Sequence, residues 1–86
     1  MAKLQAFNGL KVGQFVAEAN AADEATSEVI GWIYEIEEDG DLVWVRVVDS
    51  EAPEVTSEYA FWLADGEPVP PFEDSTIEEL IYLLAV

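Results

Sequence analysis

Two segments rich in β-branched and aromatic residues flank the dipeptide Asp39-Gly40, and this pattern constrains the fold more than any other feature of the chain. The segments are EVIGWIYEIE, residues 28–37, and LVWVRVVD, residues 42–49. Val, Ile and aromatic residues favour strands. Asp-Gly favours a two-residue hairpin turn in which both central residues need a positive φ. The sequence therefore predicts an antiparallel hairpin with its turn at Asp39-Gly40.

This turn also predicts which side of the hairpin faces the core. If Glu38 pairs with Asp41, one side carries only apolar and aromatic residues: Ile30, Trp32, Tyr34, Ile36, Val43, Val45 and Val47. The other side is mixed, because charged residues share it with Ile33, Leu42, Trp44 and Val48. Burial of that mixed side requires a curled barrel, a covering helix or a second chain.

Two further strands are predicted, at residues 10–18 and 56–63. The first follows a turn signal at Phe7-Asn8-Gly9, and its Gly13 indicates a bulge or a close approach of another backbone. Residues 19–27 are small and polar, which favours a loop or, as the alternative, an Ala-rich helical turn.

The end of the sequence has the pattern of a helix at residues 76–85. Ser75 and Glu78 have the spacing of a capping box. An apolar stripe at helical spacing follows, made of Ile77, Leu80, Ile81 and Leu84. Before it, residues 64–73 are Pro-rich and are expected to be extended.

Together these elements predict one mainly β domain over residues 1–86: a small SH3-like bent sheet or barrel of about four to five strands with one C-terminal α-helix. The strand spacing in VGQFVAEA and GWIYEIEEDGDLVWVRV resembles that of SH3-like and KOW-like barrels, over roughly residues 10–63. Such barrels often bind nucleic acid through basic loops. Because the loops of this chain are acidic, the resemblance implies a fold and not that function.

The chain has no Cys and no His, which excludes disulfides and the usual zinc sites. It also lacks the usual bases and strong nucleophiles of enzymes, so neither an enzyme nor a cofactor is predicted. A calcium loop starting at Glu35 would have Arg46 where a bidentate Glu is needed, so no metal site is predicted. No apolar run approaches the length of a membrane span, and the first residues do not form a secretory signal. We expect a soluble, cytoplasmic protein.

The chain has 19 Asp and Glu against 3 Lys and Arg, a formal net charge of -16. Crowded carboxylates repel one another in the folded state, which raises their pKa values. By linkage, such groups make stability fall as pH rises through their titration range. We therefore predict that added salt or mildly acidic buffer raises the melting temperature. A melting temperature that does not respond to salt would count against a concentrated acidic surface.

Nine of these acids lie between residues 35 and 58, where Arg46 is the only base: Glu35, Glu37, Glu38, Asp39, Asp41, Asp49, Glu51, Glu54 and Glu58. A net charge of about 2 to 8 is enough to keep a small domain soluble. Alternate strand positions such as Glu35 and Glu37 lie about 6.6–6.8 Å apart. This is the scale on which a basic groove meets successive DNA phosphates, of which each strand has one per roughly 3.4 Å of helix axis. The pattern favours mimicry of DNA over a merely solvated surface.

In size, charge and scarcity of Lys, the chain resembles small acidic DNA-mimic inhibitors, many of them phage-encoded. The resemblance implies an inhibitor that occupies the nucleic-acid-binding surface of a basic DNA-binding protein, and it transfers no individual residues. From the charge pattern of this chain, we expect the nine acids to take the place of phosphates and Trp44 to add an apolar anchor. Direct binding to nucleic acid or to a membrane is not expected, and a homodimer stays open. The alternatives are an acidic protein–protein adaptor unrelated to DNA and a structural domain of a halophile.

Overall fold

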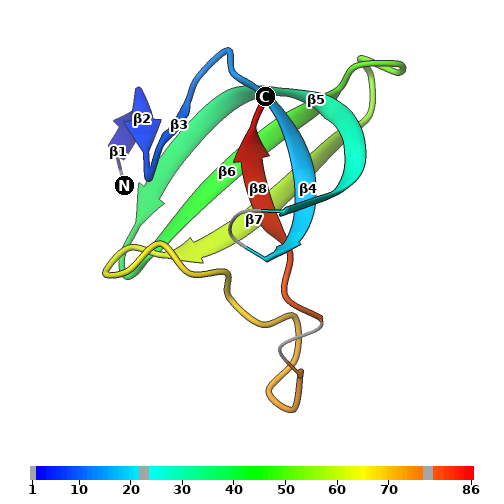
Figure 1. Ribbon diagram of the computed structural model, residues 1–86. Coiled ribbons are helices and arrows are strands. Elements are labelled where there is room, and N and C mark those ends of the chain that lie inside the picture. Colours follow the sequence, from blue (N-terminus) through cyan, green and yellow to red (C-terminus); the bar gives the residue numbers. More distant parts are fainter. Residues whose placement is uncertain (1, 22–23, 77–78) are drawn as a thin grey trace.

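Strand β5 (Glu24–Asp39) organises the fold, because it is long enough to pair with three other strands (Figure 1). Along one edge it pairs first with β4 (Phe15–Ala21) and then with β1 (Ala2–Leu4). Strand β6 (Leu42–Asp49) pairs along the other edge. The computed structural model describes residues 2–21, 24–76 and 79–86.

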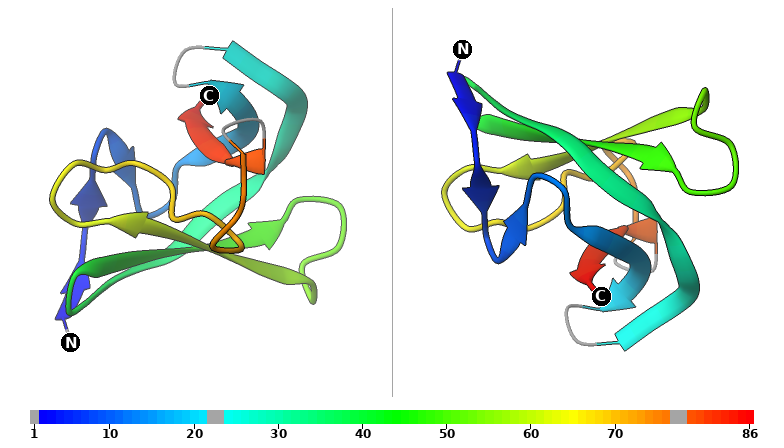
Figure 2. Two further views of the ribbon diagram at one scale, coloured as in Figure 1. Left: turned by 90° about the horizontal axis from the view of Figure 1, so that it is seen from below. Right: turned by 90° about the horizontal axis from the view of Figure 1, so that it is seen from above.

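The sheet continues from β6 to β7 (Thr56–Trp62) and from β4 to β8 (Tyr82–Ala85), in the antiparallel order β7-β6-β5-β4-β8. A small hairpin of β2 (Ala6–Phe7) and β3 (Leu10–Lys11) lies beside it. Figure 2 shows that β5 bends strongly, so that β4 and β8 lie opposite β6 and β7. The predicted mainly β fold is confirmed, but the sheet does not close into a barrel.

The core fills the space inside this bend. Nine buried apolar residues form it, and six of them come from β4, β5 and β6: Leu10, Val16, Ile33, Ile36, Val43, Val45, Val47, Phe61 and Leu83. Burying a side chain of this size contributes about 1.5–3 kcal/mol. Because the nine residues come from six strands, the core depends on long-range pairing and not on any single hairpin.

The β5–β6 hairpin forms as predicted, but its turn lies one residue further along the chain. Asp39 pairs with Leu42, so the two turn residues are Gly40 and Asp41. Gly40 has a φ of 62°, and Asp41 does not have a positive φ. A turn whose first central residue is a Gly with positive φ is of type II′. The predicted register was therefore wrong by two positions on the partner strand, which leaves Ile36, Val43 and Val45 on the core side.

A β-bulge overturns the predicted core side at the other end of this hairpin. The register shifts between Ile33 and Glu35, so Tyr34 has no partner on β6. A bulge of one residue reverses which face each following residue takes. Ile33 is consequently fully buried, whereas Tyr34 is exposed and Trp32 is half-buried against Phe15. The predicted sides of the hairpin for Ile33, Trp32 and Tyr34 were therefore wrong, and the bulge is the reason for all three.

The turn at Asn8-Gly9 is confirmed, and it is here that both central residues have positive φ, 50° and 84°. The predicted strand at residues 10–18 is split into β3 and β4, because Gly13 adopts a φ of 92° between them. The predicted loop at residues 19–27 was wrong for the described residues, since β4 runs to Ala21 and β5 starts at Glu24.

The predicted helix at residues 76–85 was also wrong. Residues 82–85 form β8, which pairs with β4, and the described part of the chain contains no α-helix. The run from Leu80 to Val86 has no charged residue and therefore suits a strand as well as a helix. Ile77 and Glu78 of the predicted stripe and capping box lie outside the described residues. No described helix is long and apolar enough to span a membrane.

Candidate partner-binding surface

Three of the nine predicted site acids belong to an ion-pair network on the outer face of the sheet. Cross-strand pairing brings Lys3 opposite Glu37, and Arg46 opposite both Glu35 and Glu58. Lys3 Nζ lies 2.5 Å from Glu35 Oε1 and 3.4 Å from Glu37 Oε2. The Arg46 guanidinium donates to Glu37 at 3.0 Å, to Glu58 at 2.8 Å and also to Glu35. These three carboxylates are therefore paired within the protein.

This network reverses the expected pKa direction for two carboxylates. A hydrogen bond from Lys3 is the main cause that lowers the pKa of Glu35, and one from Arg46 is the main cause that lowers the pKa of Glu37. A lowered pKa in the folded state stabilises the fold above the ordinary carboxyl pKa near 4.5, and this contribution is lost as pH falls through the folded value. Acid is therefore expected to weaken this part of the molecule.

We predict that Arg46→Met lowers the free energy of unfolding by about 1–2 kcal/mol at neutral pH, because three carboxylates lose a charged donor. Methionine keeps most of the aliphatic stem. The loss should shrink well below pH 4.5, where the carboxylates become protonated. Denaturant melts at both pH values measure it, with Lys11→Met as the control, since Lys11 makes no ion pair with another described residue. An Arg46 effect that grows in acid would contradict the network.

Three of the remaining predicted acids, Glu38, Asp39 and Asp41, lie at the tip of the β5–β6 hairpin. The chain after β7 returns to this tip, where the Leu63 N–H donates to the Asp41 carbonyl at 2.8 Å. Asp65 lies in the same turn region and lines one hollow together with Asp41. No Lys or Arg among the described residues pairs with these four acids, which we call the tip cluster.

Asp65 is not among the site residues predicted from the sequence. The signal was available, because Asp65-Gly66 repeats the Asp-Gly dipeptide of the hairpin tip and Gly66 has a positive φ of 74°. The sequence could not show that the turn after β7 packs beside the β5–β6 turn. That placement follows from the pairing of Leu42 with Trp62, which brings the two strand ends together.

Exposed apolar side chains lie directly beside the tip cluster. The hollow of about 500 Å³ that Asp41 and Asp65 share is also lined by Trp62 and Leu63, which are 41% and 39% exposed. Aromatic side chains set in a polar rim are common anchors of protein interfaces. This end of the molecule therefore combines negative charge with an accessible apolar anchor.

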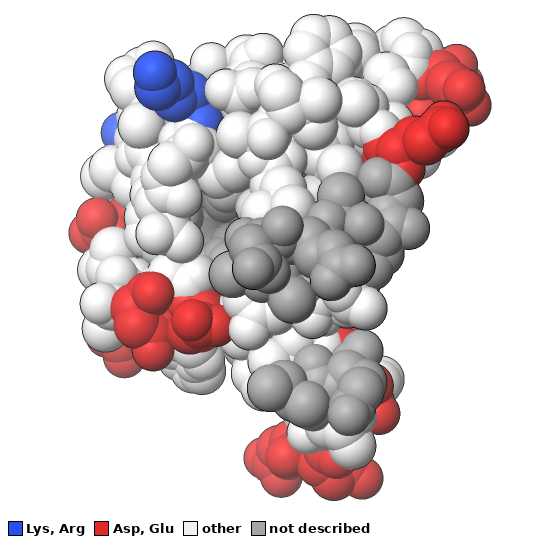
Figure 3. Space-filling view, in the orientation of Figure 1, with Lys and Arg blue, Asp and Glu red and all other residues white. Residues whose placement is uncertain are grey.

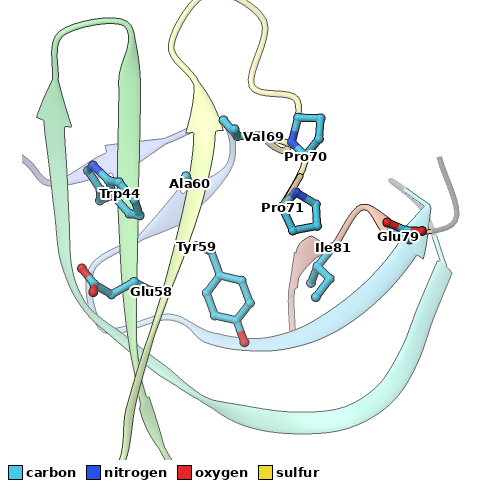
Figure 4. A pocket seen from close by; sticks show the side chains of 9 residues that line it. All are labelled: Trp44, Glu58, Tyr59, Ala60, Val69, Pro70, Pro71, Glu79 and Ile81. Atoms are coloured by element: carbon cyan, nitrogen blue, oxygen red, sulfur yellow. The ribbon is translucent and has the colours of Figure 1, made fainter. Parts of the chain in front are cut away.

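Trp44, the predicted anchor, is half-buried on the same face as Trp62, because it pairs with Ala60 on the adjacent strand. It lines a second hollow of about 330 Å³, whose other walls include Glu58, Pro70 and Pro71 (Figure 4). In this view the connector that carries the two prolines passes beside β7. The protein's own connector therefore flanks part of the mixed face that was predicted to need a cover.

The last three predicted site acids lie at the opposite end of β6. Asp49 Oδ1 accepts the N–H groups of Glu51 and Ala52 at 2.7 and 3.0 Å, so this carboxylate stabilises the β6–β7 turn. Glu54 is exposed in the same turn. The eight residues of β6 separate this turn from the tip cluster, a distance of about 23 Å from the rise of a strand.

The nine predicted acids therefore do not form a single site. Figure 3 shows separate acidic groups on the face it presents, near the β5–β6 tip, near the β6–β7 turn and on the connector loop. Two acids of the tip cluster, Asp41 and Asp65, share one hollow with exposed Trp62 and Leu63. On the connector loop a single acid, Glu73, lines a hollow with exposed Trp62 and Phe72.

No known family model matches the sequence, and comparisons with curated proteins and with solved structures find no significant match.

Proposed function

We propose that this protein is a DNA-mimic inhibitor that occupies the nucleic-acid-binding surface of a basic DNA-binding protein. The tip cluster of Glu38, Asp39, Asp41 and Asp65 takes the place of phosphates in this proposal. Trp62 and Leu63 add apolar contacts beside them. We further propose that the bent sheet is SH3-like. The strand order β7-β6-β5-β4-β8, in which the central strand β5 is shared by the two halves of the sheet, supports this.

The observation that carries the proposal is the contrast between paired and unpaired acids. Glu35, Glu37 and Glu58 each form an ion pair with Lys3 or Arg46. The tip acids have no such partner among the described residues, so a cationic partner is free to supply one. Compared with the sequence-based hypothesis, the proposed contact keeps the tip acids Glu38, Asp39 and Asp41 and adds Asp65 in the turn after β7. The other six predicted acids are no longer part of it.

The charge of the whole chain supports rapid capture of a cationic target. A net charge of -16 on a small domain attracts a basic surface from a distance. Such steering weakens as salt shortens the Debye length to about 8 Å at physiological ionic strength. The proposed complex should therefore form more slowly at high salt. Trp62 and Leu63 would still contribute to its lifetime.

The experiment that tests the function is capture from a cell lysate on the immobilised protein, with and without competing duplex DNA. The proposal predicts that a DNA-binding protein is captured and that duplex DNA prevents its capture. Capture that duplex DNA does not reduce would instead support an acidic adaptor. A melt in dilute buffer separates the halophile alternative, because a halophile's domain fails to fold there.

A further inference from the structure

The outer edge of β8 carries backbone groups that no described strand uses. The Val86 N–H donates to the Phe15 carbonyl at 2.9 Å, which marks these two residues as a hydrogen-bonded pair. In an antiparallel ladder, such pairs alternate with non-hydrogen-bonded pairs, whose N–H and C=O groups point away from the partner strand. By this alternation, Leu83 and Ala85, which lie opposite Glu18 and Val16, direct their N–H and C=O groups away from β4.

Two other edge strands, β7 and β1, are partly covered or short, as is usual for edges that must not pair with other chains. Along β7, Pro68 forms a bridge with Phe61, and the Val69 N–H donates to the Ala60 carbonyl at 3.0 Å. Strand β1 has three residues. Strand β8 lies in the run LIYLLAV, residues 80–86, which contains neither a charged residue nor a proline. No hydrogen bond between described residues reaches its outward-facing amides.

The space beside this edge is hollow. A cavity of about 320 Å³ follows the whole of β8 and is bounded on its far side by the Asn8-Gly9 turn, Phe61 and Gly66. Strands β7 and β8 do not pair with each other, and the cavity is lined from both, by Phe61 of β7 and by all four residues of β8. An extended segment that pairs with β8 could therefore place apolar side chains in this cavity.

The charge of the chain decides which kind of segment fits. A second copy would bring another net charge of -16 to the same edge, which opposes self-association. A cationic segment gains from that charge. Glu67 is already placed at one end of the edge, where it accepts a hydrogen bond from the Tyr82 hydroxyl at 3.0 Å.

We propose that β8 is a docking edge for an extended segment of a partner protein that alternates apolar residues with Lys or Arg. The segment pairs with the backbone of Leu83 and Ala85 and directs its apolar side chains into the cavity. This is strand addition, in which main-chain hydrogen bonds give affinity and side chains give selectivity. The proposed docking edge goes beyond the inhibitor function, because its residues are not part of the tip cluster.

The test uses a synthetic peptide of alternating Lys and Val, and the same peptide N-methylated at every second backbone amide. Each of the two possible sets of alternate amides is methylated in turn, so that either register of pairing is blocked. Both peptides carry the same charge, but the methylated one cannot form the ladder. Hydrogen exchange of the Leu83 and Ala85 amides and the binding affinity are measured on the full chain. The matched variants are Ala85→Pro, which removes an outward N–H without breaking a bond to β4, and Ala85→Val, which keeps it.

We expect the unmodified peptide to bind and to slow exchange of both amides. N-methylation or Ala85→Pro should weaken binding about tenfold or more, whereas Ala85→Val and the tip variants Asp39→Asn and Asp41→Asn should change it by less than about twofold. The N-methylated peptide keeps the test valid even if Ala85→Pro misfolds. Absence of binding, or equal binding of both peptides, would overturn the proposal. Self-association of the protein with both amides protected would assign the edge to a second copy and would also overturn it.

Discussion

Gly31→Ala is expected to lower the free energy of unfolding by at least about 3 kcal/mol, the upper part of the range for overpacked sites. A Cβ at this position would lie 1.8 Å from the carbonyl oxygen of Val48 and 2.8 Å from the carbonyl carbon of the same residue. Both atoms belong to the backbone of β6, the strand paired with β5, so no side-chain rotation relieves the clash. Denaturant melts followed by circular dichroism measure the loss.

The matched control is Gly9→Ala, which tests backbone strain without a clash. Gly9 has a φ of 84°, and an added Cβ there meets nothing within 4 Å. A left-handed conformation costs a residue with a side chain roughly 1–2 kcal/mol. We therefore expect a smaller loss for Gly9→Ala than for Gly31→Ala. Equal losses would contradict the close approach of the Val48 backbone to Gly31.

Removal of three tip charges is expected to have the largest effect on partner binding. We predict that the triple variant Asp39→Asn, Asp41→Asn and Asp65→Asn binds its captured target about 30-fold more weakly, at roughly 0.5–1 kcal/mol for each charge pair. Asparagine keeps the acceptor through which Asp65 Oδ1 receives the Glu67 N–H at 3.0 Å. The melting temperature should not fall, because no cation among the described residues pairs with these acids.

The control removes three charges from the opposite end of β6, by Asp49→Asn, Glu51→Gln and Glu54→Gln. The amide oxygen introduced by Asp49→Asn can still accept the two turn N–H groups that the carboxylate accepts. Because both triple variants have the same net charge, a difference between them isolates position from total charge. Affinities measured by calorimetry at two salt concentrations should show a weaker salt dependence for the tip variant. Equal losses in both variants would mean that the charge acts without a defined site.

The strands of the central hairpin were predictable because residue type and turn chemistry act locally. Strand β6 has the predicted bounds, and Gly40 lies in the turn. The register was not predictable, since Asp39-Gly40 and Gly40-Asp41 both suit a two-residue turn. The bulge at Tyr34 has no local signal in the sequence, because it is a property of the pairing between β5 and β6.

The error at the end of the chain shows how tertiary pairing decides between two local patterns. Leu80, Ile81 and Leu84 have helical spacing, and they also belong to a short uncharged apolar run that can form a strand. In the structure this run completes the open edge of β4 and places Leu83 in the core. Only knowledge that β4 needs a partner would have favoured the strand.

The site was predictable in its charge but not in its location. Glu35 and Glu37 have the alternating strand spacing that led to the mimicry hypothesis. Whether they face a partner depends on Lys3, which lies more than 30 residues away along the chain and reaches them through the pairing of β1 with β5. Asp65 joins Asp41 through a similarly distant contact. Such placements follow from topology, which composition and spacing do not encode.

The most direct measurement of the central claim is a competition experiment with a captured and purified target. Labelled duplex DNA is bound to the target, and this protein is added at increasing concentration while fluorescence anisotropy reports the bound DNA. Complete release of the DNA is predicted, with a midpoint that moves to higher concentration for the tip variant and stays in place for the control. Formation of a ternary complex, with the DNA still bound when this protein saturates the target, would contradict the claim.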